Sequence, residues 1–300
     1  MREKALKEST IWQVVAHMVM IIGSLLALLP FVLLVIASFT DNQTALVNGY
    51  SFTPEKWSLA AYEYIAAQWS TIGRAYLMTI LVTVIGTVLS LVITSTFAFA
   101  VSNDKLPGHK VLMFLCIFTM LFNGGIVASY YIYSNIFHIR DTIWALIVPT
   151  LLMSPFNVVL VKNYFTNSIS PSILEAAQID GASVFAVFLK IVIPLSVPIL
   201  ATVGLMTAIA YWNDWTNGLY YLTEMNGADL FTIQIVLNKI NENINFLANN
   251  SELAATAASQ LPSTTMRMAI AVIGILPIII AYPFFQRYFV KGITLGGVKE

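Results

Sequence analysis

Long apolar stretches constrain this chain more than any other feature of its sequence. Six of them occur along the 300 residues, and each approaches the roughly 20 apolar residues that an α-helix needs to cross a bilayer. Because only 10% of the residues are charged and 58% are hydrophobic, a water-soluble fold could not bury so much apolar surface. The sequence therefore predicts an all-α membrane protein with six transmembrane helices, at about 13–38, 75–101, 110–133, 142–164, 197–220 and 266–290.

The third and fourth stretches are interrupted by polar and helix-breaking residues. Asn123 is followed directly by two glycines, and the fourth stretch contains two prolines and Asn157. Helices broken in this way usually face other protein or a water-filled path, because lipid cannot satisfy the backbone groups that a break leaves free. Asn123 and Asn157 are therefore candidates for a substrate path. Hydrogen bonding between helices is the alternative explanation for both.

The distribution of basic residues predicts the orientation of the chain. The apolar run from Ile11 to Phe39 is far longer than the roughly 7–15 residues of a signal-peptide core, so we interpret it as a retained anchor. With both termini in the cytoplasm, ten of the 15 lysines and arginines fall on inner segments, as expected for cytoplasmic loops. We therefore expect a cytoplasmic N-terminus at 1–10, a transmembrane domain at 11–290 and a cytoplasmic tail at 291–300.

Charge and cysteine content exclude several functions. The 15 basic and 15 acidic residues balance and form no block of like charge, so nothing indicates binding to nucleic acid. The single cysteine, Cys116, allows no disulfide within the chain. The three histidines, His17, His109 and His138, lack the spacing of zinc ligands, and we expect no metal site.

One long inner segment, 166–196, has a dense pattern of apolar and small residues that is unusual for a cytoplasmic loop. Ser170 followed by Pro171 is a typical helix start, with serine as the N-cap and proline at the first helical position. Ser172 with Glu175 offers an alternative start, a capping box. A short helix should begin at one of these two serines.

A glycine turn and a second short helix should follow. Gly181 is suited to the left-handed turn that ends many helices, and Ser183 can cap the next helix. The pair would lie at the cytoplasmic surface, either as a plug for a groove in another protein or as interfacial helices resting on lipid headgroups. The second helix should have one apolar face, made of Phe185, Phe188, Leu189 and Val192.

The same segment carries a motif with specific spacing. It consists of a glutamate-alanine-alanine triplet, a glycine, and a later stretch that ends in proline. The residues are Glu175, Ala176, Ala177, Gly181, Ile191, Val192, Ile193 and Pro194. This pattern resembles the EAA loop of binding-protein-dependent ABC importer permeases, with isoleucine in place of the usual leucine before the proline.

Other stretches extend the resemblance. Residues 119–125, 211–215 and 282–292 are similar to the smaller, MalG-like sugar permeases, and more narrowly to the branch associated with uptake of oligosaccharides and polysaccharide fragments. The resemblance implies a type I ABC importer permease fold over 11–290, in the cytoplasmic membrane of a bacterium. It also implies that the segment 166–196 holds a cytoplasmic coupling helix.

The resemblance further implies the partners of the chain. Because the sequence has no GxxxxGK[ST] phosphate-binding loop, ATP and Mg²⁺ would be bound by a separate ATPase, and this chain would bind no cofactor and catalyse no reaction. The implied partners are two ATPase copies, a second, MalF-like permease, an extracytoplasmic sugar-binding protein, the carbohydrate itself and membrane lipid. The residues implied in ATPase coupling are Glu175, Ala176, Ala177, Asp180, Gly181, Ile191 and Pro194.

Aromatic and amide side chains gather towards the end of the fifth stretch. Aromatic rings can stack on the apolar faces of sugars, and amides can hydrogen-bond to their hydroxyls. Tryptophan and tyrosine also form ordinary belts at membrane interfaces, which is the alternative interpretation. With the two asparagines, the candidate substrate path comprises Asn123, Tyr130, Tyr131, Asn157, Tyr211, Trp212, Asn213 and Trp215.

Three other functions are alternatives. The chain could be an ABC importer permease for a solute other than a sugar. An integral membrane enzyme would need converging acid, base or metal groups, and the sequence has no such cluster at ligand spacing. A secondary transporter would usually carry acidic residues within its membrane helices, and the six apolar stretches hold essentially none.

Overall fold

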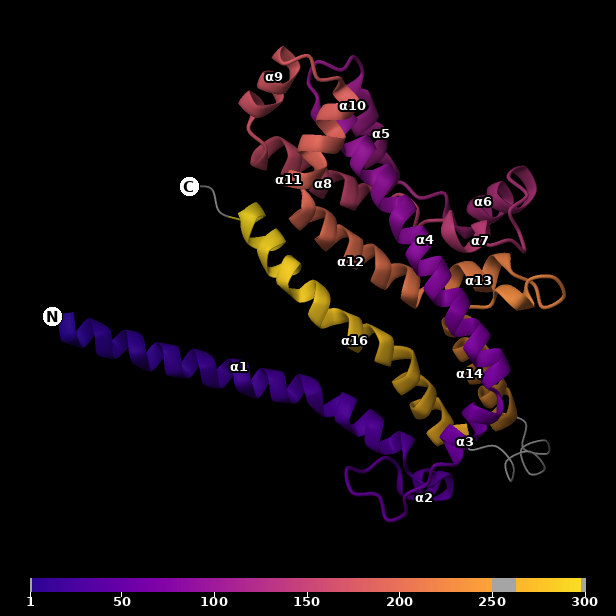
Figure 1. The fold of residues 1–300 in the computed structure, drawn as a ribbon. Helices are drawn as coiled ribbons and strands as arrows, with labels where there is room; N and C mark the ends of the chain where they lie inside the picture. The colour runs from indigo at the N-terminus through magenta and orange to yellow at the C-terminus, as the bar shows by residue number, and fades with distance from the viewer. Residues whose placement is uncertain (1, 250–262, 298–300) are drawn as a thin grey trace. The chain divides into compact units, whose positions relative to one another are not determined.

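A computed structural model describes most of the chain, as residues 2–249 and 263–297 (Figure 1). Within these ranges the structure is almost entirely helical, and extended backbone pairs only in an isolated antiparallel bridge between Thr40 and Trp57. The prediction of an all-α chain is thus confirmed for the described residues. The residues outside them are Met1, 250–262 in the predicted outer loop and 298–300 in the predicted tail.

The chain divides into two compact units. Each unit combines segments that are distant in sequence, and two helices, α14 (Ile233–Asn249) and α16 (Ser263–Gly297), contribute to both. The first unit consists of Met1–Trp69 and Lys239–Leu276, and the second of Ser70–Asn238 and Pro277–Glu300.

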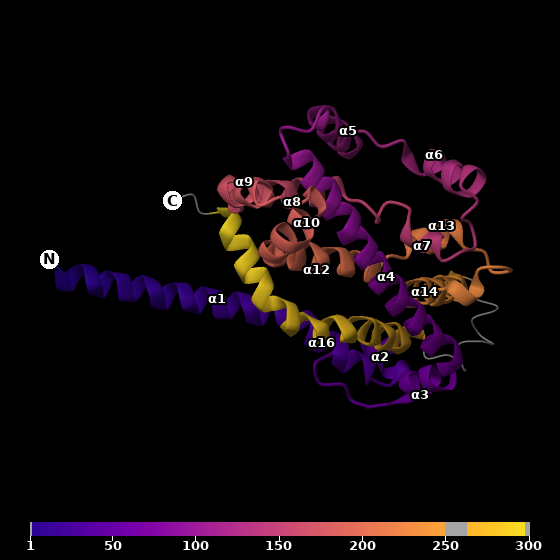
Figure 2. The same ribbon diagram turned by 45° about the horizontal axis from the view of Figure 1, so that its top comes forward.

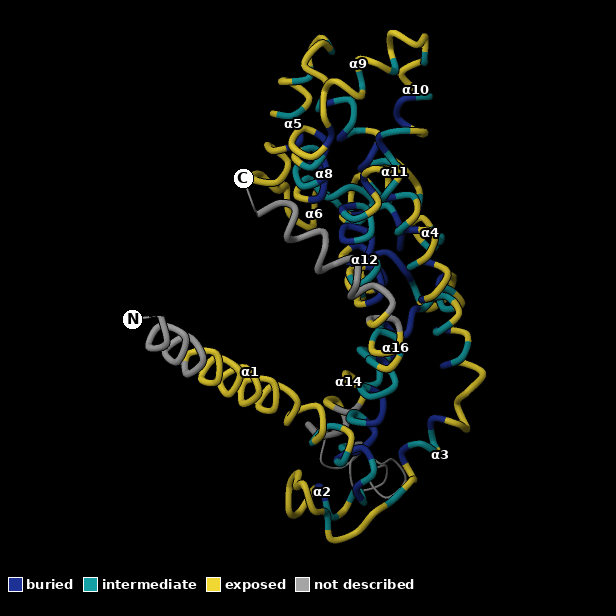
Figure 3. The backbone as a smooth tube through the Cα atoms, turned by 60° about the vertical axis from the view of Figure 1, so that its left-hand side comes forward, coloured by how far each residue is buried: buried dark blue, intermediate teal, exposed yellow. Residues whose placement is uncertain are grey.

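The first unit contains α1 (Arg2–Ser38), α2 (Asn42–Asn48) and α3 (Ala60–Ala67). The part of α1 from Trp12 to Ser38 has the length and hydropathy of a membrane span, and none of its most apolar window is buried (Figure 3). The predicted first span is therefore one continuous helix.

The second unit is built around α4 (Trp69–Ser102) and α12 (Val197–Asn213). Shorter helices connect and flank these two (Figures 1 and 2). In chain order they are α5 (His109–Leu121), α6 (Gly125–Tyr131), the π-helix η1 (Ile132–Ile136), α7 (Trp144–Ile147), α8 (Pro155–Ser168), α9 (Pro171–Ile179), α10 (Val184–Val187), the π-helix η2 (Phe188–Val192), α11 (Ile193–Leu195), α13 (Thr216–Tyr221) and the 3₁₀-helix η3 (Ala228–Leu230).

The predicted third span is not one straight helix. The chain bends by 119° between its two halves, His109–Leu121 and Gly125–Ile136. Phe122 between them is extended, and the side-chain oxygen of Asn123 accepts a hydrogen bond from the Gly125 N–H at 2.8 Å. A local turn thus replaces the helical hydrogen bonds at the position where the sequence has its polar and glycine residues.

The predicted fourth and fifth spans are also divided. Helix α7 ends at Ile147, and α8 begins only at Pro155, which occupies the first turn where its missing N–H does no harm. Helix α12 ends before Asp214, whose carboxylate accepts the N–H groups of Thr216 and Asn217 at the start of α13. The prolines and the aspartate therefore set these boundaries.

The number of membrane spans is not fixed by helix length. Among the described residues, two helices are long and apolar enough to cross a membrane, and up to four spans result if each of two bent pairs counts as one. One bent pair is the divided third span, and the other consists of Val184–Leu195 and Val197–Asn213, with a bend of 79° between them. The sixth predicted span lies within the longer α16. The count of six stays a prediction.

The core of the second unit consists of two buried clusters, one near each end of α12. The first brings together Ala98 of α4, Val161 of α8 and Val203 of α12. The second brings together Val82 of α4 and Tyr211 of α12 with residues of α7 and α13. Residues near the end of α4 pack on the start of α12, so the two helices run antiparallel. Together they span the distance between the two clusters.

Candidate functional site

Helix α9 forms the first half of the predicted helix-turn-helix. Ser170 has the extended backbone of an N-cap, and Pro171 is the first helical residue. The alternative start at Ser172 is not used; its hydroxyl lies 2.7 Å from that of Ser170. The first of the two predicted starts is therefore confirmed.

The turn after α9 is a Schellman motif centred on Gly181. Gly181 has φ +82°, and its N–H bonds to the carbonyl of Gln178 at 3.1 Å. The Ala182 N–H bonds to the carbonyl of Ala177 at 2.9 Å, which is the second hydrogen bond of this motif. Ala177 and Ala182 both pack against the first core cluster, so the turn is held by hydrogen bonds and by apolar contact.

The second helix begins as predicted, but its apolar face differs. Ser183 caps α10 by accepting the Ala186 N–H at 3.2 Å. Phe188 and Val192 are buried, whereas Phe185 is 68% exposed and Leu189 is 46% exposed. The cause is the π-helix η2, whose wider turn directs Phe188 and Val192 inwards and leaves the other two outside. The expected face is thus wrong for half of its members.

The outward side of the α9 turn is exposed and mixed in character. Glu175, Ala176, Asp180 and Gly181 are all exposed, and Ile179 at the end of α9 is 86% exposed. Ala177 points to the core instead. Of the other two residues implied in ATPase coupling, Ile191 is partly buried and Pro194 is exposed. An apolar and acidic surface on a rigid turn is suited to contact with another protein.

Two candidates for the substrate path have protein partners. The Tyr211 hydroxyl donates to the Ile147 carbonyl at 2.8 Å, and the Asn157 amide donates to the Thr207 hydroxyl at 3.3 Å. Both side chains are buried. The contact of Asn157 favours its alternative interpretation, hydrogen bonding between helices. Tyr211 also joins two helices, which is neither the sugar contact nor the interfacial belt that the sequence suggested for it.

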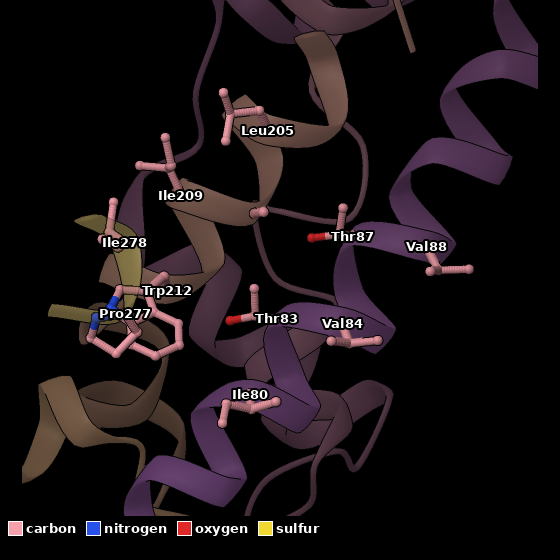
Figure 4. A pocket seen from close by; sticks show the side chains of 11 residues that line it. Ile80, Thr83, Val84, Thr87, Val88, Leu205, Ile209, Trp212, Pro277 and Ile278 are labelled. Carbon is pink, nitrogen blue, oxygen red and sulfur yellow. The ribbon is translucent and has the colours of Figure 1, made fainter. Parts of the chain in front are cut away.

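Trp212 lines a pocket of about 440 Å³ between α4, α12 and α16. Figure 4 shows the hydroxyls of Thr83 and Thr87 directed into the space between α4 and α12, where every other lining residue is apolar. Such a lining is suited to apolar groups better than to sugar hydroxyls. The lining residues are Ile80, Thr83, Val84, Thr87, Val88, Leu205, Ala208, Ile209, Trp212, Pro277 and Ile278.

The other path candidates are dispersed. Asn123 forms the turn between α5 and α6, and the Tyr130 ring stacks on Tyr221 with centroids 5.9 Å apart. Trp212 is the one member of the predicted set that lines the pocket. The structure therefore does not bring the eight predicted residues into one cavity. The exposed members are Asn123, Tyr131, Asn213 and Trp215.

One polar cluster was missed by the sequence interpretation. The Asp141 carboxylate accepts hydrogen bonds from the Thr223 N–H and hydroxyl. These residues are 82 positions apart, and an isolated Asp-Thr pair gives no sequence signal of such a contact. Among the described residues, no group of three or more His, Cys, Asp or Glu side chains is placed to hold a metal ion.

Comparison with known proteins gives consistent matches. Residues 92–295 match the family described as "Binding-protein-dependent transport system inner membrane component". The polygalacturonan/rhamnogalacturonan transport system permease protein YtcP of Bacillus subtilis (strain 168) is 36% identical over 277 residues, which are 92% of this chain and 94% of YtcP. Protein LplC of the same organism is 33% identical, covering 91% of this chain and 90% of LplC.

A solved structure has the same fold. It is the crystal structure of a bacterial ABC transporter involved in the import of the acidic polysaccharide alginate, and one of its chains is 30% identical with a TM-score of 0.78. The match covers 93% of this chain and 96% of that chain.

Proposed function

Since the chain belongs to the family of binding-protein-dependent transport system inner membrane components, we propose that it is one permease subunit of an ATP-driven ABC importer for carbohydrate. The observation that carries the proposal is the α9 turn. It presents an exposed apolar and acidic surface while its base is fastened to the core at Ala177 and Ala182.

The α9 turn acts as the coupling helix in this proposal. The contact surface towards the ATPase comprises Glu175, Ala176, Asp180 and Gly181, with Ala177 fixing the turn from behind. The segment after α9 also contacts a long helix of the unit. The centroids of the Phe188 ring in η2 and the Phe99 ring near the end of α4 are 5.0 Å apart, so motion of α9 can be passed to α4. Ile191 and Pro194 lie on the connection from η2 to α12.

We propose six spans, with both termini in the cytoplasm. The permease domain then extends over 11–290, and the bent pair His109–Leu121 with Gly125–Ile136 serves as a broken span. Two lines of support are the continuous α1 and the excess of basic residues on the segments assigned to the cytoplasm. The α9 turn then lies at the cytoplasmic surface of the bacterial membrane.

The partners follow from the same proposal. This subunit is non-catalytic and binds no cofactor, and ATP with Mg²⁺ is bound by two copies of a separate ATPase. A second, MalF-like permease completes the pore, and an extracytoplasmic binding protein delivers the sugar. The family description, which names a binding-protein-dependent system, supports this assembly.

The proposed substrate is an oligosaccharide. YtcP is described as a polygalacturonan/rhamnogalacturonan permease and the structural relative as an alginate importer, so polysaccharide fragments are the class we infer. We retain Asn123, Tyr130, Tyr131, Trp212, Asn213 and Trp215 as the proposed substrate path. We assign Asn157 and Tyr211, which were predicted with them, to contacts between helices.

The test is reconstitution of the whole importer. The chain is expressed with its partner permease and ATPase, purified, and placed in proteoliposomes with the binding protein outside. We expect a stable complex that takes up labelled oligosaccharides only when ATP is present. Uptake of peptides or amino acids instead would contradict the sugar assignment, and a chain that transports without any ATPase would contradict the importer assignment.

A further inference from the structure

The guanidinium group of Arg267, near the start of α16, has an incomplete set of partners. The residue is half-buried, and its Nη2 donates a hydrogen bond to the side-chain oxygen of Asn245 at 2.9 Å. Its Nε–H is buried and has no hydrogen-bond partner among the described residues. Because a charged donor removed from water is costly while it stays unpaired, this arrangement indicates that an acceptor from elsewhere completes it.

Three other basic residues on the predicted outer segments each have a carboxylate neighbour. The pairs are Lys56 with Asp41, Arg74 with Asp229 and Arg140 with Asp141. Arg267 instead contacts a neutral amide, and no carboxylate of the described ranges forms an ion pair with it. Its positive charge is therefore not neutralised within the part of the chain that the structure describes.

The surroundings of Arg267 are built from three segments of the first unit. Tyr50 follows α2, Asn245 belongs to α14, and Arg267 belongs to α16. The side-chain oxygen of Asn42, the first residue of α2, accepts the Thr264 N–H at 3.1 Å. This hydrogen bond fastens α2 to the first turn of α16, so the loop that carries Tyr50 is held beside the arginine by a contact outside the site itself.

Tyr50 and Asn245 offer further donors near the guanidinium group. Partial burial raises the pKa of the Tyr50 hydroxyl, and the nearby charge of Arg267 acts in the opposite direction, so the hydroxyl stays protonated at neutral pH. The Asn245 oxygen already accepts from Arg267, which leaves its NH₂ group to donate. Both side chains are exposed and can be reached by a ligand. Converging donors around a positive charge suit a carboxylate, which only accepts.

We propose that Arg267, with Tyr50 and Asn245 beside it, forms a carboxylate-binding site whose ligand is a uronate group of an acidic oligosaccharide. This inference rests on the proposed function and narrows its substrate class to charged sugars. In the topology proposed above, Arg267 directly follows an outer loop, so the site lies on the side from which the sugar arrives. The planar guanidinium group matches the two oxygens of a carboxylate, whereas the hydroxyls of a neutral sugar need no charged partner.

Uptake of two matched sugars tests the selectivity. Trigalacturonate and its methyl ester share rings and linkages and differ in charge, so the ratio of their uptake rates isolates the carboxylate. In the reconstituted importer, Arg267→Gln should lower this ratio about tenfold, and Arg267→Lys, which keeps the charge without the planar fork, should lower it less. Arg140→Gln makes the same change at an arginine with an acidic neighbour and should leave the ratio as it was. An unchanged ratio in Arg267→Gln would overturn the proposal.

Occupancy of the site has a readout that does not depend on transport. Cys116 is buried, so a trifluoromethyl label can be attached selectively to Ser51→Cys, an exposed position next to Tyr50 in the sequence. In the whole complex in nanodiscs, without binding protein, trigalacturonate should shift the fluorine resonance of this label, and the methyl ester should not. Arg267→Gln should abolish the shift, and Tyr50→Phe should weaken it. A label that responds equally to both sugars would contradict recognition of the carboxylate.

Other results would assign Arg267 to a different partner and overturn the proposal. A resonance that follows the phosphatidylglycerol content of the nanodisc, and not trigalacturonate, would assign the site to a lipid phosphate. A lower thermal midpoint in Arg267→Gln with an unchanged uptake ratio would show that the arginine is paired within the chain. Failure of the proposed function is distinct from all of these, because the unmodified importer would then take up neither sugar in response to ATP.

Discussion

The Tyr211 hydroxyl donates a hydrogen bond to the Ile147 carbonyl oxygen at 2.8 Å and so joins the end of α12 to the last residue of α7. Both residues are buried, and Ile147 ends its helix, so its carbonyl has no partner further along α7. Tyr211→Phe should lower the free energy of unfolding by about 1–3 kcal/mol, because it leaves a buried carbonyl unpaired. The thermal midpoint of the purified complex in detergent measures the effect.

A matched control is available on α13. Tyr220 is exposed, and Tyr220→Phe should leave the midpoint nearly unchanged. If Tyr211 instead contacts sugar, Tyr211→Phe would raise the KM for uptake and leave the midpoint where it was. That outcome would contradict the structural role.

The Asn157–Thr207 hydrogen bond allows a second test of the substrate path. In membrane proteins such a bond between helices contributes on average about 0.6 kcal/mol. If the two residues only join α8 to α12, Asn157→Leu and Thr207→Val should each lower the thermal midpoint slightly, and the double variant should lose less than the sum. The KM for oligosaccharide uptake should stay the same in all three. A rise in KM for Asn157→Leu alone would assign this amide to the path.

These cases show what the sequence could and could not predict. Local signals worked where the cause is local: Ser170 with Pro171 begins α9, and Gly181 ends it. The apolar face of the next helix was half wrong, because a π-turn has no clear sequence signal and shifts which side chains point inwards. Hydropathy located apolar stretches but not the 119° bend at 122–124, since it ignores backbone direction.

Contacts between distant residues were beyond sequence pattern altogether. The Asp141–Thr223 cluster joins positions 82 apart, and its residue types occur in many ordinary loops. The same holds for the path candidates. Their aromatic and amide composition suggested sugar contact, yet Tyr211 and Asn157 use their polar atoms to join helices.

Asp41 makes the stability of α2 depend on pH. Partial desolvation would raise the pKa of its carboxyl, but the hydrogen bond from the Thr44 N–H and the charge of Lys56 outweigh it and hold the pKa below its usual value. A lowered pKa means that the stabilising contribution is present above the unfolded-state pKa of about 3.9 and is lost as the pH falls through the folded-state value. The protection factors of the α2 amides, taken against the intrinsic exchange rate at each pH, should therefore fall below about pH 4.

Two variants separate charge from capping at this position. Asp41→Asn keeps an N-cap acceptor for the Thr44 N–H but cannot titrate, so the loss of protection at low pH should disappear. Asp41→Ala removes the cap and should destabilise α2 by about 1 kcal/mol at neutral pH, and the difference from the unmodified chain should shrink as the pH falls. Unchanged pH dependence in Asp41→Asn would show that another group is responsible.

Gly181 is the position where backbone conformation and proposed coupling meet. At φ +82° a β-branched side chain is strained by about 1–2 kcal/mol, although open space surrounds the missing Cβ. Gly181→Val should therefore disturb the Schellman turn and the orientation of α9 without affecting the membrane helices. We expect normal insertion and continued ATP hydrolysis, with sugar uptake reduced about tenfold or more, because 1.4 kcal/mol corresponds to one factor of ten.

Asparagine provides the matched control, because it adopts the left-handed conformation far more readily than valine does. Gly181→Asn adds a side chain of similar size into the same open space, so uptake should stay near that of the unmodified importer. If both variants lose uptake equally, the added side chain itself blocks the contact with the ATPase, and the left-handed backbone conformation of Gly181 is not the cause. If neither loses uptake, α9 does not couple the ATPase to transport, and the role proposed for the motif would have to be abandoned.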